Sequence, residues 1–246
     1  MSDARHASGG GAQLPLALRC PPDQRFEAFL AAPAGLLQHL RALATVPGTE
    51  WCHLSGAAAA GKTHLALATC AEVEAHGRRA AFLPLASARG RLGDALQSLH
   101  DYDLIALDAL ETVAGDRDDE VALFDFHNRA RAAGKAVLYT AQGLPAELPL
   151  ALPDLRSRLS QCVRFALAPL DDDGRRAVLQ LRAQRRGLGL DDAALDWLLR
   201  RVGRDLATLT GLLDRLDRAS LAAQRRLTVP FLRQVLDEDA DAAGRS

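Results

Sequence analysis

Residues 56–63 read Gly-Ala-Ala-Ala-Ala-Gly-Lys-Thr and match the phosphate-binding pattern G-x-x-x-x-G-K-[ST]. In such a loop, backbone N–H groups and the N-terminus of the following helix surround the phosphates of a nucleotide. The pattern assigns Gly56 and Gly61 to the loop, places Lys62 on the β- and γ-phosphates and makes the hydroxyl of Thr63 a ligand of Mg²⁺. The alternative is an Ala/Gly-rich turn that precedes a helix and binds nothing.

Asp108 is the second candidate metal residue. It ends an apolar run, residues 103–108, that is typical of a strand buried on both faces. A carboxylate in that place beside a phosphate loop holds Mg²⁺ through water, whereas elsewhere a strand-end Asp often only caps a turn. The next residue is Ala109, where many nucleotide hydrolases of this architecture carry an acid that orients the attacking water. We therefore expect nucleotide binding with slow hydrolysis by the chain itself.

Two further groups could act on a phosphate. Thr140 ends an apolar run and is a candidate sensor of the γ-phosphate, or simply a β-branched strand residue. Arg156 and Arg158 lie two positions apart, so they share a face in an extended chain and diverge in a helix. They form either a solvated basic turn or an arginine finger, which stabilises transition-state charge on the nucleotide of a neighbouring molecule.

The elements around these residues alternate in type. Short apolar runs predict strands, separated by segments with helical spacing, and this order implies a parallel α/β sheet. The predicted strands are 51–55, 80–85, 103–108, 136–140 and 162–167, and the helices between them are 63–76, 91–100 and 118–133. After Pro169 only helices are predicted, at roughly 171–186, 191–201, 204–223 and 229–238.

The composition excludes several classes of protein. The chain has 246 residues, 48% of them hydrophobic, and a net charge of −1, so nothing attracts it globally to nucleic acid or to a membrane. Its four cysteines form no C-x-x-C pair, which argues against a disulfide framework or a zinc site. The sequence shows no membrane-spanning run and no signal peptide, so we expect a cytoplasmic protein without membrane contact.

These motifs together resemble the DnaA-related AAA+ family, and most closely its Hda-type regulatory inactivators of DnaA. The resemblance runs from about residue 13 to residue 236 and is carried by Gly61-Lys-Thr-His-Leu65, Leu155-Arg-Ser-Arg-Leu159 and Ala223-Gln-Arg-Arg-Leu-Thr-Val-Pro-Phe231. It implies a P-loop AAA+ parallel α/β domain followed by a small all-α lid domain. The expected divisions are an N-terminal tail at 1–20, the AAA+ domain at 21–169, the lid at 170–240 and a tail at 241–246.

The N-terminal tail contains Gln13-Leu-Pro-Leu-Ala-Leu18, which is similar to the Q-L-x-L-x-L peptide by which Hda-type proteins dock on the DNA polymerase sliding clamp. An extended peptide could place Gln13 in a polar pocket and Leu14, Leu16 and Leu18 on an apolar groove. Without the resemblance, the same residues could equally begin the folded domain.

Three departures from the family pattern bear on function. Ala59 replaces a glycine that is common in this loop, and Ala207 stands where the lid usually carries a nucleotide-sensing arginine, although Arg204 is nearly one turn away. The sequence stops at Ser246, which leaves no room for the DNA-binding domain of an initiator.

The resemblance implies a negative regulator of DNA replication initiation that binds ADP or ATP with Mg²⁺. Together with the DNA-loaded sliding clamp (β subunit), it would stimulate hydrolysis of DnaA-bound ATP through Arg158, contacting DNA only through the clamp. Its own ATPase would be weak, and self-association is left open. The alternatives are an ATP-driven helicase loader or remodelling ATPase, and a small-molecule kinase, which would explain neither the lid nor the N-terminal peptide.

Overall fold

Five parallel strands form the centre of the structure. The computed structural model describes residues 24–30 and 32–201, and beyond them residues 212, 216, 219 and 228–234. The strands lie in the order β2-β3-β4-β1-β5. They are β1 (Cys52–Gly56), β2 (Ala80–Pro84), β3 (Leu104–Asp108), β4 (Ala136–Ala141) and β5 (Val163–Leu167), so the predicted parallel sheet is confirmed, with strand ends within one residue of their expected places.

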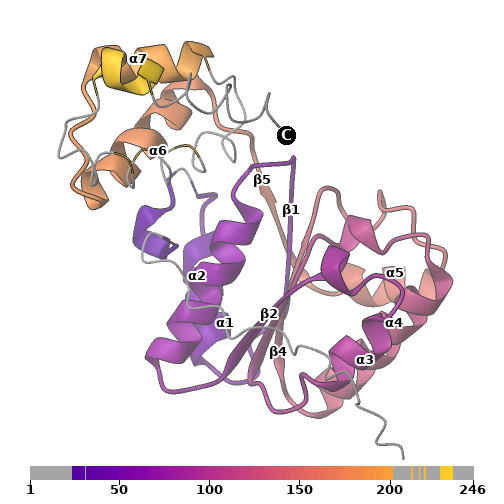
Figure 1. Ribbon diagram of the computed structural model, residues 1–246. Helices are drawn as coiled ribbons and strands as arrows, with labels where there is room; N and C mark the ends of the chain where they lie inside the picture. Colours follow the sequence, from indigo (N-terminus) through magenta and orange to yellow (C-terminus); the bar gives the residue numbers. More distant parts are fainter. Residues whose placement is uncertain are drawn as a thin grey trace, which may run out of the picture.

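Helices cover both faces of the sheet, as parallel strands require, because each connection must return to the opposite edge. One face carries α1 (Leu36–Thr45) and α2 (Lys62–Ala75), and the other carries α3 (Leu92–Gln97), α4 (Arg117–Ala132) and α5 (Pro153–Ser160) (Figure 1). Short 3₁₀ turns lie at Phe26–Ala28, Leu85–Ala88 and Leu110–Thr112. Because the strands are parallel, their C-terminal ends lie together on one side of the sheet, where β1 passes into the 56–63 loop.

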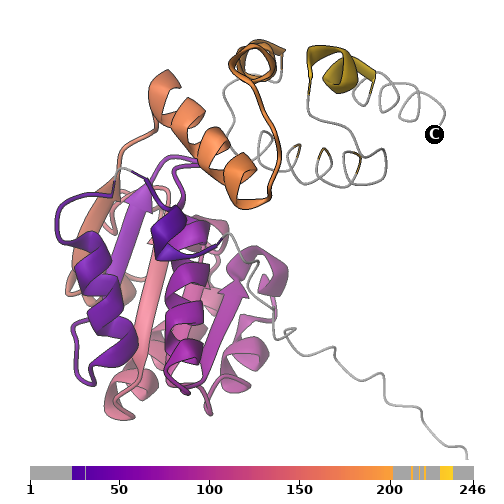
Figure 2. The same ribbon diagram turned by 90° about the vertical axis from the view of Figure 1, so that its left-hand side faces the viewer.

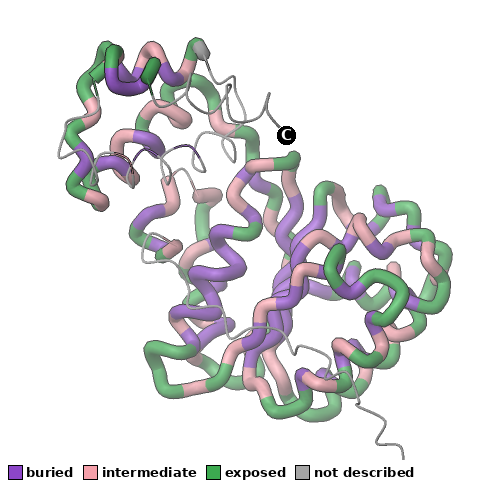
Figure 3. Tube along the Cα trace, viewed as in Figure 1, coloured by how far each residue is buried: buried purple, intermediate pink, exposed green. Residues whose placement is uncertain are grey.

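The core follows from this three-layer arrangement. Every residue of β3 is buried, as expected for a central strand that is covered on both faces. Figure 3 shows the buried positions concentrated on the strands and on the inner sides of α1, α2 and α4. Each fully buried leucine or isoleucine contributes about 1.5–3 kcal/mol, which holds the strand ends in fixed relative positions.

A second, all-helical part follows the sheet, as predicted. It contains α6 (Asp172–Arg185), α7 (Asp192–Arg201) and a helical turn at 229–234 (Figure 2). Its own apolar cluster includes Leu179, Leu195, Leu198, Leu216 and Leu232. The predicted helix 204–223 falls mostly outside the described residues, and the residue boundaries of the domains stay predictions.

The 153–160 segment is a helix that the sequence analysis left undecided. Pro153 occupies the first turn, where its missing N–H costs nothing, and Leu155 and Leu159 lie one turn apart and are buried. Arg156 and Arg158 therefore diverge, since two helical positions are separated by about 200°. Arg156 is half-buried, whereas Arg158 is exposed.

Candidate functional site

Close contacts with neighbouring atoms explain both loop glycines. A Cβ atom at Gly56 would lie 2.8 Å from the carbonyl oxygen of Leu167, and one at Gly61 would lie 2.6 Å from Cε2 of Phe29. Gly61 also has φ of 94°, in the left-handed region that favours glycine. Ala59 also has a positive φ, of 60°, although it carries a Cβ atom. The loop thus turns tightly into the first turn of α2.

Lys62 lies folded over this loop and is only 8% exposed. Its Nζ donates to the carbonyl oxygens of Gly56 (2.7 Å) and Ala57 (2.8 Å). Burial lowers the pKa of Lys62, and the nearby carboxylates of Glu111 and Asp108 act against that shift. The ammonium group is therefore held at the mouth of the loop by two protein oxygens.

The structure brings Thr63, Asp108 and Thr140 together, although they come from α2, β3 and β4. Thr63 Oγ1 donates to Asp108 Oδ2 (2.9 Å), and Thr140 Oγ1 donates to Asp108 Oδ1 (2.6 Å). Thr140 is fully buried and also accepts a hydrogen bond from the backbone N–H of Ala109 (2.9 Å). A carboxylate flanked by two hydroxyls is a set of hard oxygen donors that suits Mg²⁺.

No acidic side chain follows Asp108 directly. Ala109 occupies that place with φ of 67°, and the nearby Glu111 accepts a hydrogen bond from the backbone N–H of Gln142 (3.0 Å). Glu111 is therefore engaged with the turn after β4. The methyl side chain of Ala109 cannot polarise water.

Sequence reasoning missed the contacts of His64 and Arg182, which lie beside the loop. His64 Nε2 lies 3.0 Å from the carbonyl oxygen of Arg25, and Arg182 Nη2, from the lid helix α6, lies 3.4 Å from His64 Nδ1. These contacts fit a neutral imidazole with its proton on Nε2. A separation of 118 residues gives no local signal in a sequence.

A small apolar cavity of about 30 Å³ lies between the loop and the lid. Its lining includes Phe29, Gly61, Leu167, Val178 and Arg182. The ring of Phe29 also packs 5.6 Å from that of His64. This volume is close to that of one water molecule.

Arg158 lies near the N-terminal ends of the strands, whereas the phosphate loop lies at their C-terminal ends. The loop follows the end of β1, whereas α5 runs back and its last turn leads into the start of β5. A five-residue strand spans roughly 16 Å, which separates Arg158 from the chain's own loop. The helix α5 that carries Arg158 packs against α4. After burial, the charge of Arg158 contributes to lowering the pKa of His127 on α4 to about 4.

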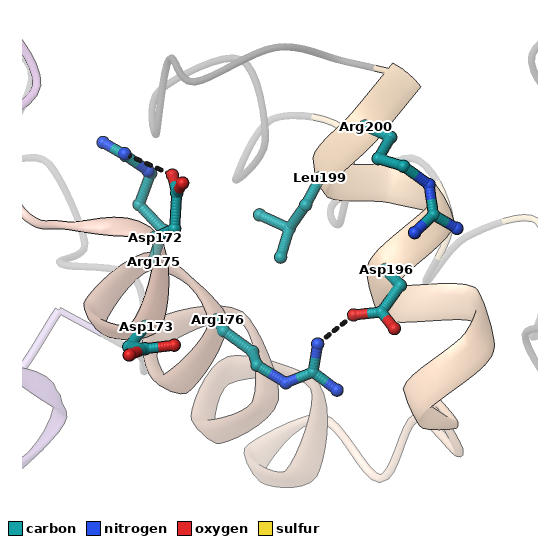
Figure 4. A pocket seen from close by; sticks show the side chains of 7 residues that line it. All are labelled: Asp172, Asp173, Arg175, Arg176, Asp196, Leu199 and Arg200. Atoms are coloured by element: carbon teal, nitrogen blue, oxygen red, sulfur yellow. Dashed lines mark hydrogen bonds and ion pairs between the residues drawn. The ribbon is translucent and has the colours of Figure 1, made fainter.

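The lid has a separate polar groove of about 460 Å³ between α6 and α7 (Figure 4). Arg176 reaches across it to Asp196 and also pairs with Asp192 (2.8 Å), while Arg175 pairs with Asp172 (2.6 Å). With Arg200, the described lining has three arginines and three aspartates, so these residues together carry no net charge.

Several predicted residues fall outside the described part. Gln13, Leu14, Leu16 and Leu18 are among them, as are the lid positions 204 and 207. Within the described residues, no cluster of three or more His, Cys, Asp or Glu side chains could hold a metal ion. No described helix is both long and apolar enough to span a membrane.

Comparisons with known proteins agree with this architecture. Residues 172–236 match the family described as Hda, lid domain. The chain is similar over 89% of its length to domain III of the replication initiation protein DnaA from Thermotoga maritima, with a TM-score of 0.72, 19% identity and 98% of that domain covered. AMPPCP-bound DnaA from Aquifex aeolicus gives a TM-score of 0.65 and 18% identity, over 91% of this chain and 71% of that one.

A more distant structure shares the same fold. The Thermotoga maritima RuvB Holliday junction branch migration motor gives a TM-score of 0.58 at 15% identity, over 84% of this chain and 69% of that one. At such identities these likenesses establish the fold, and the match at 172–236 establishes the type of lid. The chain thus has a DnaA-like AAA+ fold with a phosphate loop at the strand ends, followed by a helical segment that matches the Hda lid domain, as predicted.

Proposed function

We propose that this protein is a negative regulator of DNA replication initiation. It binds ADP or ATP with Mg²⁺ at the phosphate loop and docks on the DNA-loaded sliding clamp through residues 13–18. There it presents Arg158 to the ATP held by DnaA and so stimulates hydrolysis of that ATP. The relation to Hda and DnaA supports a role in replication, and the finer steps rest on the arguments below.

Nucleotide binding is supported by the chemistry of the loop. Lys62 already lies over the loop, and the oxygens of Thr63 and Asp108 suit Mg²⁺. Lys62 would face the phosphate oxygens of a bound nucleotide, and Thr63 and Asp108 would hold the metal ion that neutralises their charge. The related Aquifex aeolicus DnaA is bound to AMPPCP.

The observation that carries the proposal is the place of Arg158. It is exposed, and the sheet lies between it and the phosphate loop of its own chain. An arginine in this place cannot act on its own nucleotide but is free to reach one that is bound by another molecule. Such arginines stabilise the charge that develops on the transferred phosphoryl group.

The residue after Asp108 supports a regulator over a motor. With Ala109 at that position, no carboxylate directly follows Asp108 to orient water against the chain's own ATP. We therefore infer a slow intrinsic turnover, in which the bound nucleotide mainly sets the shape and assembly of this protein. Self-association, which would show as a nucleotide-dependent change in molecular mass, is compatible with this arrangement.

The deciding experiment measures hydrolysis of ATP bound to purified DnaA, with this protein and with clamp loaded on DNA. We expect stimulation only when all three are present, and a turnover by this protein alone below ~1 s⁻¹. Fast turnover by this protein alone, with no effect on DnaA, would instead support a helicase loader or remodelling ATPase.

A second arm tests the N-terminal peptide. Replacing Gln13 and Leu14 by alanine should abolish clamp binding in a pulldown while leaving the thermal melt and ADP affinity at their wild-type values. The separation is expected because the peptide precedes Pro21-Pro22 and the folded domain. Clamp binding that survives the double substitution would show that another surface makes the contact.

A further inference from the structure

Glu120 joins two helices through one buried carboxylate. It lies in the first turn of α4 and is 0% exposed. Its Oε1 accepts hydrogen bonds from the backbone N–H groups of Gly115 (2.7 Å) and Ala151 (2.9 Å), and its Oε2 accepts one from that of Leu152 (2.6 Å). Three donors offset the cost of burying the carboxylate. Two of them belong to the segment that leads into α5.

The start of α5 lacks a cap of its own. Leu152 is the N-cap residue and has no side-chain acceptor, and Pro153 follows it. With only eight residues, α5 is too short to be stable without tertiary contacts. Arg156 also holds the segment before α5, because its Nη2 donates to the carbonyl oxygen of Leu150 (2.6 Å). Glu120 and Arg156 together fix where α5 begins.

We propose that Glu120 is a positioning residue for Arg158, which rests on the proposed function because Arg158 acts there as the finger. Arg158 lies less than two turns beyond Leu152 on the same short helix. Any rotation of the α5 entry about the buried Leu155 and Leu159 is therefore passed on to the guanidinium. A catalytic group displaced by about 1 Å can lose roughly 100-fold in rate.

Asp119 provides a matched control. It precedes Glu120 on α4, is 2% exposed, and accepts from the backbone N–H groups of Gly90 (2.9 Å) and Leu92 (3.4 Å). Asp119 thus fixes the backbone at the N-terminus of α3, as Glu120 fixes the backbone at the N-terminus of α5. Asp119→Asn and Glu120→Gln each replace a buried carboxylate by an amide, but only the second affects the segment that carries Arg158.

The test titrates each variant of the full-length protein into the assay of DnaA-bound ATP hydrolysis with DNA-loaded clamp. We expect Glu120→Gln to lower the maximal rate by roughly 10- to 100-fold, with little change in the concentration that gives half of it, because the docking peptide is intact. Asp119→Asn should keep the wild-type maximal rate. Equal maximal rates for the two variants would overturn the proposal.

Hydrogen exchange adds a readout that needs no partner. Glu120→Gln should speed the exchange of the backbone amides at 151–160, and Asp119→Asn should speed that of Gly90 and Leu92. Unchanged exchange at 151–160 in Glu120→Gln would also overturn the positioning role. Arg158→Ala is measured alongside, because stimulation that survives that change refutes the finger itself.

A second pair of variants decides the matter if Glu120→Gln does not fold. Arg156→Gln loosens the same entry by removing the bond to Leu150, without leaving a buried carboxylate unpaired. Its control is Arg175→Gln, because Arg175 Nη1 makes the same kind of bond, to the carbonyl oxygen of Leu170 (2.6 Å), at the start of α6. Arg156→Gln should lower the maximal rate and Arg175→Gln should not, whereas equal rates would refute the role of the α5 entry.

Discussion

The two ends of the strands differ in how the positions of their functional residues are fixed. At the C-terminal ends of the strands, Gly56, Asp108 and Thr140 each stand at or next to a strand terminus, and the loop after β1 brings Thr63 to them in the first turn of α2, so the parallel topology and one short loop assemble the site. At the N-terminal ends, the position of Arg158 depends on a short helix that is held by side chains from α4 and from its own first turn. A binding site built on strand ends is thus fixed by the core, while the finger depends on a few buried hydrogen bonds.

The largest expected effect lies at Arg158. Arg158→Ala should fold, bind ADP and bind clamp normally, yet lower the stimulated hydrolysis by around 10³–10⁵, the range found for arginine fingers. Arg158→Lys should fail nearly as badly, since an ammonium cannot reproduce the planar guanidinium. The assay of DnaA-bound ATP hydrolysis measures both.

Arg164→Ala is the control for this change, because Arg164 is also an exposed arginine and lies on the neighbouring β5. It should retain most of the stimulation. The role of Arg158 as a finger is contradicted if the Arg158→Ala variant stimulates hydrolysis like the wild type. It is also contradicted if the variant unfolds, because Arg158 would then be a structural residue.

The next largest effect is a loss of stability at low pH that arises from two buried histidines, His53 and His127. Burial lowers the pKa of His53 to about 4 and that of His127 to about 4, with smaller contributions from nearby arginine charges. In the unfolded chain both should titrate near 6.5. The unfolded state therefore binds protons preferentially as the pH falls below 6.5, and the folded state loses stability until the pH reaches about 4.

Between pH 7 and pH 5 the loss should be roughly 2 kcal/mol for each histidine. Urea unfolding at the two pH values measures it. His53→Leu should remove about half of this pH dependence, and a variant that retains all of it would show that His53 is not the group that titrates. Arg158→Ala should raise the pKa of His127, because it removes a neighbouring positive charge.

A smaller effect is expected at the phosphate loop. Lys62→Ala removes the ammonium that faces the phosphates and should weaken ADP binding by ~1.5–3 kcal/mol, the value of one charge-assisted hydrogen bond. Calorimetry with ADP measures this loss. Lys135→Ala is the control, because it removes the chain's other lysine at the far end of the sheet, just before β4. If ADP affinity is unchanged in Lys62→Ala, the loop is not the nucleotide site.

The sequence analysis was successful where signals were local. The apolar runs predicted all five strands, and the spacing of the loop motif predicted how β1 passes into α2. The same analysis could not decide the conformation of 153–160, because its helical residues are few and its entry is capped by Glu120, more than thirty positions earlier. The contact of Arg182 with His64 was missed for the same reason, since it depends on how the lid packs over α2.

The smallest expected effect concerns Ala59, where the phosphate loop departs from its family's pattern. At φ of 60°, an alanine is strained by about 1–2 kcal/mol relative to glycine, while glycine adds about 0.4–1 kcal/mol of entropy to the unfolded chain. Ala59→Gly should therefore stabilise the protein by a net ~0.5–1 kcal/mol, measured by urea unfolding.

Ala58→Gly is the matched control, because Ala58 is not among the described residues with positive φ. It gains only the unfolded-state entropy and should lose stability. Equal losses in both variants would mean that the loop does not hold Ala59 in the left-handed conformation. A gain of stability in Ala59→Gly and a loss in Ala58→Gly would show that the phosphate loop is strained at Ala59. The loop motif is recognisable from the sequence, but this strain is visible only in the backbone geometry.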